Sequence, residues 1–169
     1  DFRQENQAKR WANSYNFSAI ENGYVKKESV KHEIPTGMQG FFINTRKEIF
    51  KDRVVRQALN YAFDFEWTNK ILFFDQYKRT NSFFSNSDLA SSGLPSNEEL
   101  KLLNPFKNKL PNDVFNKDYK NPINNGSGEI RKNLRIANKL LNDAGWIIKN
   151  GKIINKKTGM MLKFTILLV

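Results

Sequence analysis

The clearest pattern of apolar and polar positions lies in residues 50–64. Polar side chains occupy most positions there, and the apolar ones recur at the spacing of one helix face: Val55, Ala58, Leu59 and Ala62. Asp52 stands just before this run, where a carboxylate accepts hydrogen bonds from the first amides of a helix. The pattern therefore predicts an amphipathic helix that begins after Asp52.

A short apolar run, Gly40–Thr45, comes just before this helix. It is too short for a helix and rich in residues that favour strands, so it predicts a buried β-strand. A strand, a loop and an amphipathic helix in succession are half of one α/β layer. We therefore expect an α/β fold.

Weaker patterns predict the remaining elements. Ser96 and Glu99 match a capping box at a helix start, and Gly145 is placed to end a second long helix. Asn150-Gly151 and Thr158-Gly159 are typical of turns between strands. We predict helical pieces within residues 1–22, 65–74, 98–103 and 130–144, and strands in residues 24–34, 146–148, 152–154 and 162–169.

Residues 75–95 form a long polar and aromatic loop. Loops of this length in compact domains are usually functional or disordered. Its aromatic side chains argue against disorder, because burying their rings offsets the cost of ordering the chain. Stacking on a ligand is one interpretation of the aromatic residues here and in the preceding helix, but core packing is the interpretation we favour: Trp67, Phe73, Phe74, Phe83 and Phe84.

The chain of 169 residues carries a formal net charge of +11. Such a charge suits a nucleic-acid or anionic-membrane surface, whereas the even spread of lysine favours a solvated exterior. Cysteine is absent, which excludes disulfides and thiolate metal sites. No apolar run approaches the ~20 residues that cross a bilayer. Because the sequence starts without methionine and finishes on a strand-like Leu167–Val169, we expect an internal piece of a longer protein.

Residues suited to catalysis or metal binding are few. His32 is the sole histidine, so a metal would need carboxylates alone, and His32-Glu33 lacks the second histidine of a zinc helix motif. Asp64 and Glu66 are two apart on a predicted helix and should point in different directions. We predict no enzyme activity, no metal and no cofactor.

Two segments together resemble a known family. The run Gly37–Arg46 and the helix that starts Phe50-x-Asp52 are similar to the extracellular solute-binding proteins, family 5, of peptide-importing ABC transporters. In that family a strand ending in Asn-Thr leads to a helix of F-x-D-x-R-V-R-x-A-L type; here Arg53 precedes two valines, which is a small departure. Ala137–Trp146 resembles the family's A-x-x-L-L-x-x-A-G-[YW] segment.

A narrower resemblance covers Ala62–Asn69 and Tyr77–Pro95. These segments look like the Yej-type branch of that family, oligopeptide-binding proteins linked to microcin C uptake, and the matches extend over nearly the whole chain. The resemblance implies a partial lobe of a two-lobed, class II, Venus-flytrap fold of the periplasmic-binding-protein kind, with a mixed sheet flanked by helices. Residues 1–169 would be a single partial domain, most of the second lobe of a longer solute-binding protein.

The function that this resemblance implies is non-enzymatic capture of oligopeptides or peptide conjugates in the periplasm. The protein would deliver them to an ABC permease in the inner membrane, with no nucleic acid as partner, no membrane span of its own, and a monomer as the full-length form. The alternative that the charge leaves open is a basic nucleic-acid-binding domain.

The resemblance carries over few ligand-binding candidates, because the family's main peptide-gripping residues are expected in other segments. One group follows the predicted strand, at the end where open α/β sheets bind ligands: Asn44, Thr45 and Arg46. The other group lies in the long loop: Arg79, Thr80, Asn81 and Ser82. For both groups the alternative is a purely local role, in which the side chains satisfy nearby backbone groups.

Overall fold

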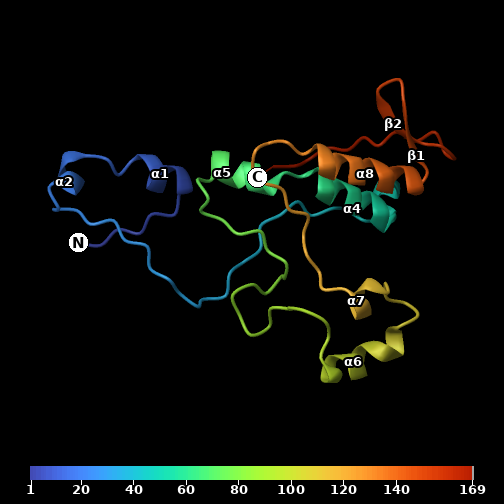
Figure 1. Cartoon of the computed structure of the whole chain (residues 1–169), viewed down its shortest axis with the longest axis horizontal. Coiled ribbons are helices and arrows are strands. Elements are labelled where there is room, and N and C mark those ends of the chain that lie inside the picture. Colours follow the sequence, from blue (N-terminus) through green and yellow to red (C-terminus); the bar gives the residue numbers. More distant parts are fainter. Residues whose placement is uncertain (169) are drawn as a thin grey trace. The chain divides into compact units, whose positions relative to one another are not determined.

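The computed structural model describes residues 1–168, and its chain divides into two compact units. One unit consists of Asp1–Gly40 and Asn69–Asn121, and the other of Phe41–Thr68 together with the chain from Pro122 onward. Most regular elements are helices, and one β-hairpin lies near the carboxyl end (Figure 1). No helix in this described range is both long enough and apolar enough to cross a membrane.

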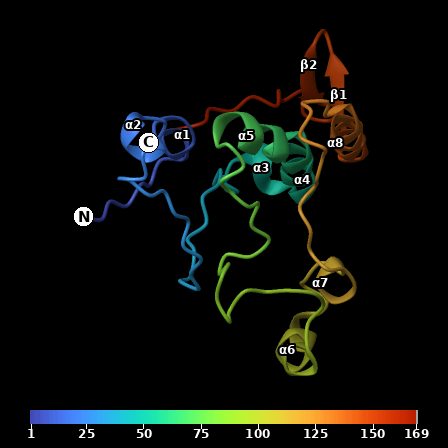
Figure 2. The ribbon, with the colours of Figure 1, turned by 60° about the vertical axis from the view of Figure 1, so that its left-hand side comes forward.

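The second unit is built on two helices that pack along each other, α4 (Arg53–Ala62) and α8 (Arg131–Asp143) (Figures 1 and 2). Asp52 caps α4 as predicted, because its side chain accepts a hydrogen bond of 2.8 Å from the amide of Val54. The short helix α3 (Glu48–Lys51) precedes α4 and buries Phe50. One cluster forms the core: Phe50, Val55, Ala58, Ala137, Leu141 and Trp146.

Gly145 ends α8, which confirms the predicted helix stop. Its φ of +81° lies in the left-handed region that glycine adopts without steric cost. The chain then forms a hairpin of β1 (Trp146–Lys149) and β2 (Lys152–Asn155), paired antiparallel. The turn between the strands has positive φ at both Asn150 (51°) and Gly151 (71°), as a type I′ turn requires.

The strand predicted for residues 162–169 is not formed in the part that the structure describes. An isolated bridge joins Ile154 and Met161, and the amide of Leu162 donates to the Ile153 carbonyl at 2.8 Å, but no ladder continues beyond that point. Val169 lies outside the described residues.

The prediction of a buried strand in Gly40–Thr45 was wrong for this structure. The segment has no regular secondary structure, and Phe41 and Phe42 are 64% and 78% exposed. A strand is stable only when another strand takes up its backbone hydrogen bonds. No described segment pairs with this one, so the predicted mixed sheet is reduced here to a two-stranded hairpin.

The first unit contains short helices joined by long irregular segments. Helices α1 (Ala8–Asn13) and α2 (Ser18–Glu21) lie where helical pieces were predicted, and η1 (Asn104–Phe106) and α7 (Asp113–Asn116) lie in the excursion after α6 (Asn97–Leu103). The capping box before α6 is confirmed, since the Ser96 hydroxyl accepts from the Glu99 amide and Glu99 accepts from the Ser96 amide. The strand predicted for residues 24–34 is absent, and Tyr24 is largely exposed.

Helix α5 (Phe65–Leu72) confirms the second short helix predicted after α4. Asn69 lies within it and is buried, where its side chain accepts a hydrogen bond from the Tyr77 amide and donates one to the Tyr77 carbonyl. This pair of bonds fastens the start of the long loop to the helix. The core prediction for the loop aromatics was wrong, because Phe83 and Phe84 are 69% and 57% exposed.

Candidate functional site

The first predicted group, Asn44–Arg46, forms an exposed turn just before α3. The Asn44 side-chain oxygen accepts hydrogen bonds from the Arg46 amide (3.1 Å) and from Arg46 Nε (3.4 Å), and the Asn44 carbonyl accepts from the Lys47 amide. Asn44 therefore has the local role that asparagine commonly takes in turns. The Thr45 hydroxyl and the guanidinium of Arg46 remain exposed to solvent.

The second predicted group, Arg79–Ser82, belongs to the other unit and lies in the irregular loop. The Thr80 carbonyl and the Asn81 side chain both accept hydrogen bonds from the side-chain amide of Asn121, at 2.8 and 2.9 Å. The Ser82 hydroxyl accepts from the amides of Phe84 and Ser91, each at 3.2 Å. These bonds give the loop a defined backbone, and Arg79 is half-buried within it.

Each group is thus a single continuous turn or loop, and the two groups lie in different units. The structure shows how each backbone is held. Their role as ligand-binding residues stays a prediction.

Sequence reasoning missed a polar network at the start of α5. Asp64 caps this helix by accepting a hydrogen bond of 3.0 Å from the Trp67 amide, and the same oxygen accepts from the side-chain amide of Asn124. Glu66 accepts from the Asn124 backbone amide at 3.2 Å. Asp64 lies just before α5 and not within it, and the two carboxylates bind different groups of Asn124: Asp64 binds the side-chain amide and Glu66 the backbone amide.

Two glycines let the loop after Asn124 approach α5 closely. A side chain at Gly126 would meet the backbone of Glu66 at 3.6 Å, and one at Gly128 would meet the Trp67 ring at 3.1 Å. Both glycines have positive φ, 68° and 85°. The loop Asn124–Gly128 is therefore held against the start of α5 by hydrogen bonds and by close packing.

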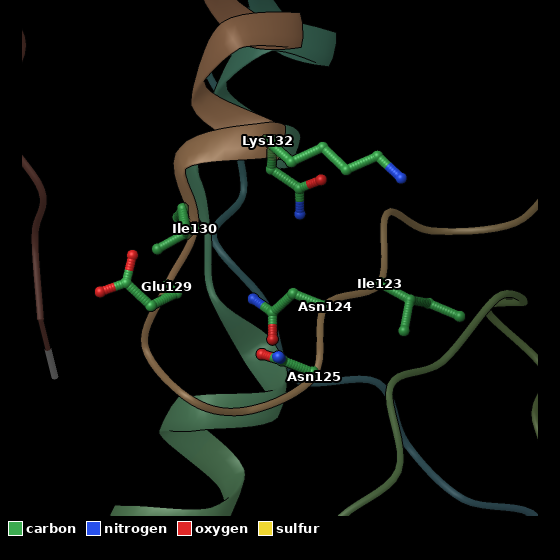
Figure 3. Close-up of a pocket in the computed structure, with 7 residues that line it drawn as sticks. Ile123, Asn124, Asn125, Glu129, Ile130 and Lys132 are labelled. Carbon is green, nitrogen blue, oxygen red and sulfur yellow. The ribbon is translucent and has the colours of Figure 1, made fainter.

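A pocket of about 270 Å³ lies between this loop and the start of α8. Figure 3 shows the Asn124 and Asn125 side chains on the loop side and Lys132 on the helix side. Its walls combine amides with one acidic, one basic and two aliphatic residues: Ile123, Asn124, Asn125, Glu129, Ile130, Lys132 and Asn133. This is a concave and mainly polar surface that suits a small hydrogen-bonding group.

A separate acidic and aromatic cluster lies in the first unit. The Gln7 amide donates to Glu5 and, as the largest effect, lowers the pKa of Glu5 below its ordinary value. Burial against its neighbours raises the pKa of Tyr15, whose hydroxyl donates to Glu5 at 3.0 Å. The Lys27 ammonium lies 4.5 Å from the centre of the Trp11 ring. These contacts fasten α1 to the chain around it.

Residues suited to metal binding do not gather in the described part of the chain. No group of three or more histidine, cysteine, aspartate or glutamate side chains there is close enough to hold a metal ion.

Comparison with known proteins defines the class. The chain belongs to the bacterial extracellular solute-binding proteins, family 5, because residues 1–169 match the middle region of that family. The family consists of solute-binding proteins of transport systems and not of enzymes. This agrees with the resemblance seen in the sequence.

Individual relatives cover the same segment. The chain is 42% identical to an uncharacterized protein YejA of Escherichia coli over 99% of its own length and 28% of that protein. It is also 42% identical to the probable peptide-binding protein YejA of Agrobacterium fabrum, again over 99% of this chain and 28% of the relative. A peptidoglycan-binding protein YepA of A. fabrum is 39% identical over 93% of this chain and 26% of its own length. The chain thus spans little more than a quarter of these relatives.

Proposed function

We propose that this chain is part of the substrate-binding component of an ABC importer, which captures oligopeptides or peptide conjugates in the periplasm and delivers them to an inner-membrane permease. The observation that carries the proposal is the family match over the whole chain, joined to 42% identity with a relative named as a probable peptide-binding protein. In this proposal residues 1–169 form most of the second of two lobes.

The mechanism that we propose is closure of two lobes on the ligand. A peptide between the lobes favours the closed state by its greater affinity for that state, and the permease receives the closed form. The exposed turn Asn44–Arg46 suits this role, because the Thr45 hydroxyl offers hydrogen bonds to a peptide backbone and the Arg46 guanidinium attracts a carboxylate. The loop Arg79–Ser82 is the second candidate wall.

The substrate class has two specific candidates within peptide conjugates. Identity of 39% with a protein named as peptidoglycan-binding favours peptidoglycan fragments that carry a peptide. Resemblance to the Yej-type branch favours peptide–nucleotide conjugates of the microcin C kind. Both have a peptide backbone, so the turn and the loop would serve either.

Titration calorimetry on the full-length parent protein tests the proposal. We expect binding of short peptides, muropeptides or a peptide–nucleotide, and about a ten-fold loss of affinity in Arg46→Gln if the guanidinium holds a carboxylate. Arg135→Gln, an equal charge change at an exposed position on α8, is the matched control and should bind as the parent does. Absence of binding by all three ligand classes would refute the transport assignment.

The nucleic-acid alternative is separated by gel shifts at rising salt. Protein binding releases counterions from the phosphates, and this release is less favourable at high salt. A basic nucleic-acid-binding domain would therefore shift DNA or RNA at low salt and would not shift it at high salt. We expect no salt-dependent shift at concentrations where peptides bind.

A further inference from the structure

The start of α8 presents backbone donors to the pocket beside it. The first amides of a helix have no intrahelical acceptor, and here they belong to Arg131, Lys132 and Asn133. The capping position is Ile130, whose side chain accepts no hydrogen bond. Since α8 runs for 13 residues, its dipole adds positive potential at this end. The helix start therefore offers donors and positive potential to whatever enters the pocket.

Asn133 is an independent sign that a ligand belongs there. Its exposure is 7%, yet it lines the pocket, and its side-chain amide makes no hydrogen bond within the described residues. Because this amide has no partner but is not sealed from solvent, it can form hydrogen bonds with a ligand that enters the pocket. By contrast, the Asn124 oxygen already accepts from the Gly126 amide, and the Asn125 oxygen accepts from Ser127. Of the three described asparagines that line the pocket, Asn133 is thus the one whose side-chain oxygen and NH₂ group can both bond to a ligand.

The loop that faces Asn133 is held before any ligand arrives. Asp64 and Glu66 both hold Asn124, and this fixes the wall opposite the helix start. A preformed wall lowers the ordering cost of binding. The loop wall of the pocket is therefore preformed and does not need to rearrange when a ligand binds.

The charges around the pocket decide its ligand class. Lys132 contributes an ammonium at the rim, while the carboxylate of Glu129 extends from the helix start in the opposite direction (Figure 3). The helix amides and the ammonium donate and do not accept, and the Asn133 amide supplies two further donors. Donors therefore dominate on the helix side, which suits an anionic acceptor.

We propose that this pocket binds the carboxylate of a peptide or peptide conjugate, held by the first-turn amides of α8, the Asn133 side chain and Lys132. The inference rests on the proposed function and adds to it the chemical group that this segment recognises. A free carboxylate and an inorganic phosphate share the anionic chemistry, so the test includes both.

The experiment uses the full-length parent protein labelled with ¹⁵N-lysine, in which the Lys132 amide resonance is assigned by its loss in Lys132→Gln. N-acetyl-alanine is the carboxylate probe, N-acetyl-alanine amide is its neutral counterpart, and inorganic phosphate is the second anion. We expect N-acetyl-alanine to shift the Lys132 resonance, and the neutral amide to leave it unchanged. Calorimetry then gives the affinity in each variant.

Asn133→Asp and Lys132→Gln should each weaken N-acetyl-alanine binding about ten-fold or more, since each alters a charged hydrogen bond. Asn133→Asp keeps the size of the side chain and places the carboxylate at the positive end of α8, and its melting temperature shows whether the variant folds as the parent does. Lys139→Gln, an equal charge change on an exposed residue of α8, is the control and should bind normally.

Three outcomes would overturn the inference: an equal response to the neutral amide, a response to phosphate but not to the carboxylate, or equal losses in Lys132→Gln and Lys139→Gln. Peptide binding that persists while N-acetyl-alanine leaves the Lys132 resonance unmoved would refute this site and spare the proposed function. Binding of N-acetyl-alanine without any peptide binding would refute the proposed function and leave the carboxylate site standing.

Discussion

Removing the Asp64 carboxylate should lower the free energy of unfolding of the second unit. The structure separates this loss into two parts, the cap of α5 and the hydrogen bond from Asn124. Asp64→Ala deletes the cap of α5, in which the Trp67 amide donates at 3.0 Å, and a lost cap costs about 0.5–2 kcal/mol. The same change deletes the hydrogen bond from the Asn124 side chain, and a bond to a charged group is worth about 1.5–3 kcal/mol. We expect a total loss of roughly 2–5 kcal/mol in the free energy of unfolding.

Urea unfolding of the parent protein measures this loss, and a double-mutant cycle with Asn124→Ala isolates the contact between the two side chains. The expected coupling is about 1.5–3 kcal/mol. Asp64→Ser is the matched control, because serine keeps a capping oxygen and is too short to reach Asn124. If Asp64→Ala and Asn124→Ala were additive within about 0.5 kcal/mol, the network would have no energetic role and the reasoning would fail.

Three further predictions concern the core, the loop and the first unit. Val55→Ala removes two methyl groups from a side chain with no exposure, and should cost about 1.5–3 kcal/mol in urea unfolding; a loss below about 0.5 would mean that the core is loosely packed. Gly128→Ala combines a φ of +85° with a contact of 3.1 Å to Trp67, so we expect a loss of about 1–2 kcal/mol and altered tryptophan fluorescence, and an unchanged spectrum would contradict the contact. The Ser96 amide lowers the pKa of Glu99 below 4.5, so the capping box stabilises α6 fully above that pH and loses this effect as pH falls through the lowered value. Hydrogen exchange in α6 should show this loss, and Glu99→Gln should abolish its pH dependence.

The helices of this chain could be predicted from sequence because their signals are local. Asp52, Ser96 and Gly145 act within one turn of the residues that they cap, so the identity of each residue and its neighbours carries the information. The apolar stripe of α4 was also predictable, because apolar residues recur along it at helical spacing. The apolar residues of α8, its packing partner, show the same spacing. The turn at Asn150-Gly151 belongs with these local signals.

Strands could not be predicted in the same way, because a strand depends on residues elsewhere in the chain. Gly40–Thr45 has the composition of a buried strand, but composition states a preference and does not supply the partner that must take up its amides and carbonyls. The hairpin forms because β1 and β2 are neighbours joined by a two-residue turn. The exposed rings of Phe83 and Phe84 have the same explanation. A ring is buried only if another part of the chain packs on it, and the spacing of aromatic residues does not show whether such a part exists.

The polar network is the strongest case for this distinction, because it joins residues about sixty positions apart. An asparagine followed by two nearby glycines is a signal for a tight loop, but we drew no prediction from it. The target of this loop could not be predicted, since nothing local says that Asn124 meets Asp64 and Glu66. The consequence is physical: the contact that starts α5 also positions the wall opposite α8, so the stability of one helix start and the shape of the pocket beside another depend on the same asparagine.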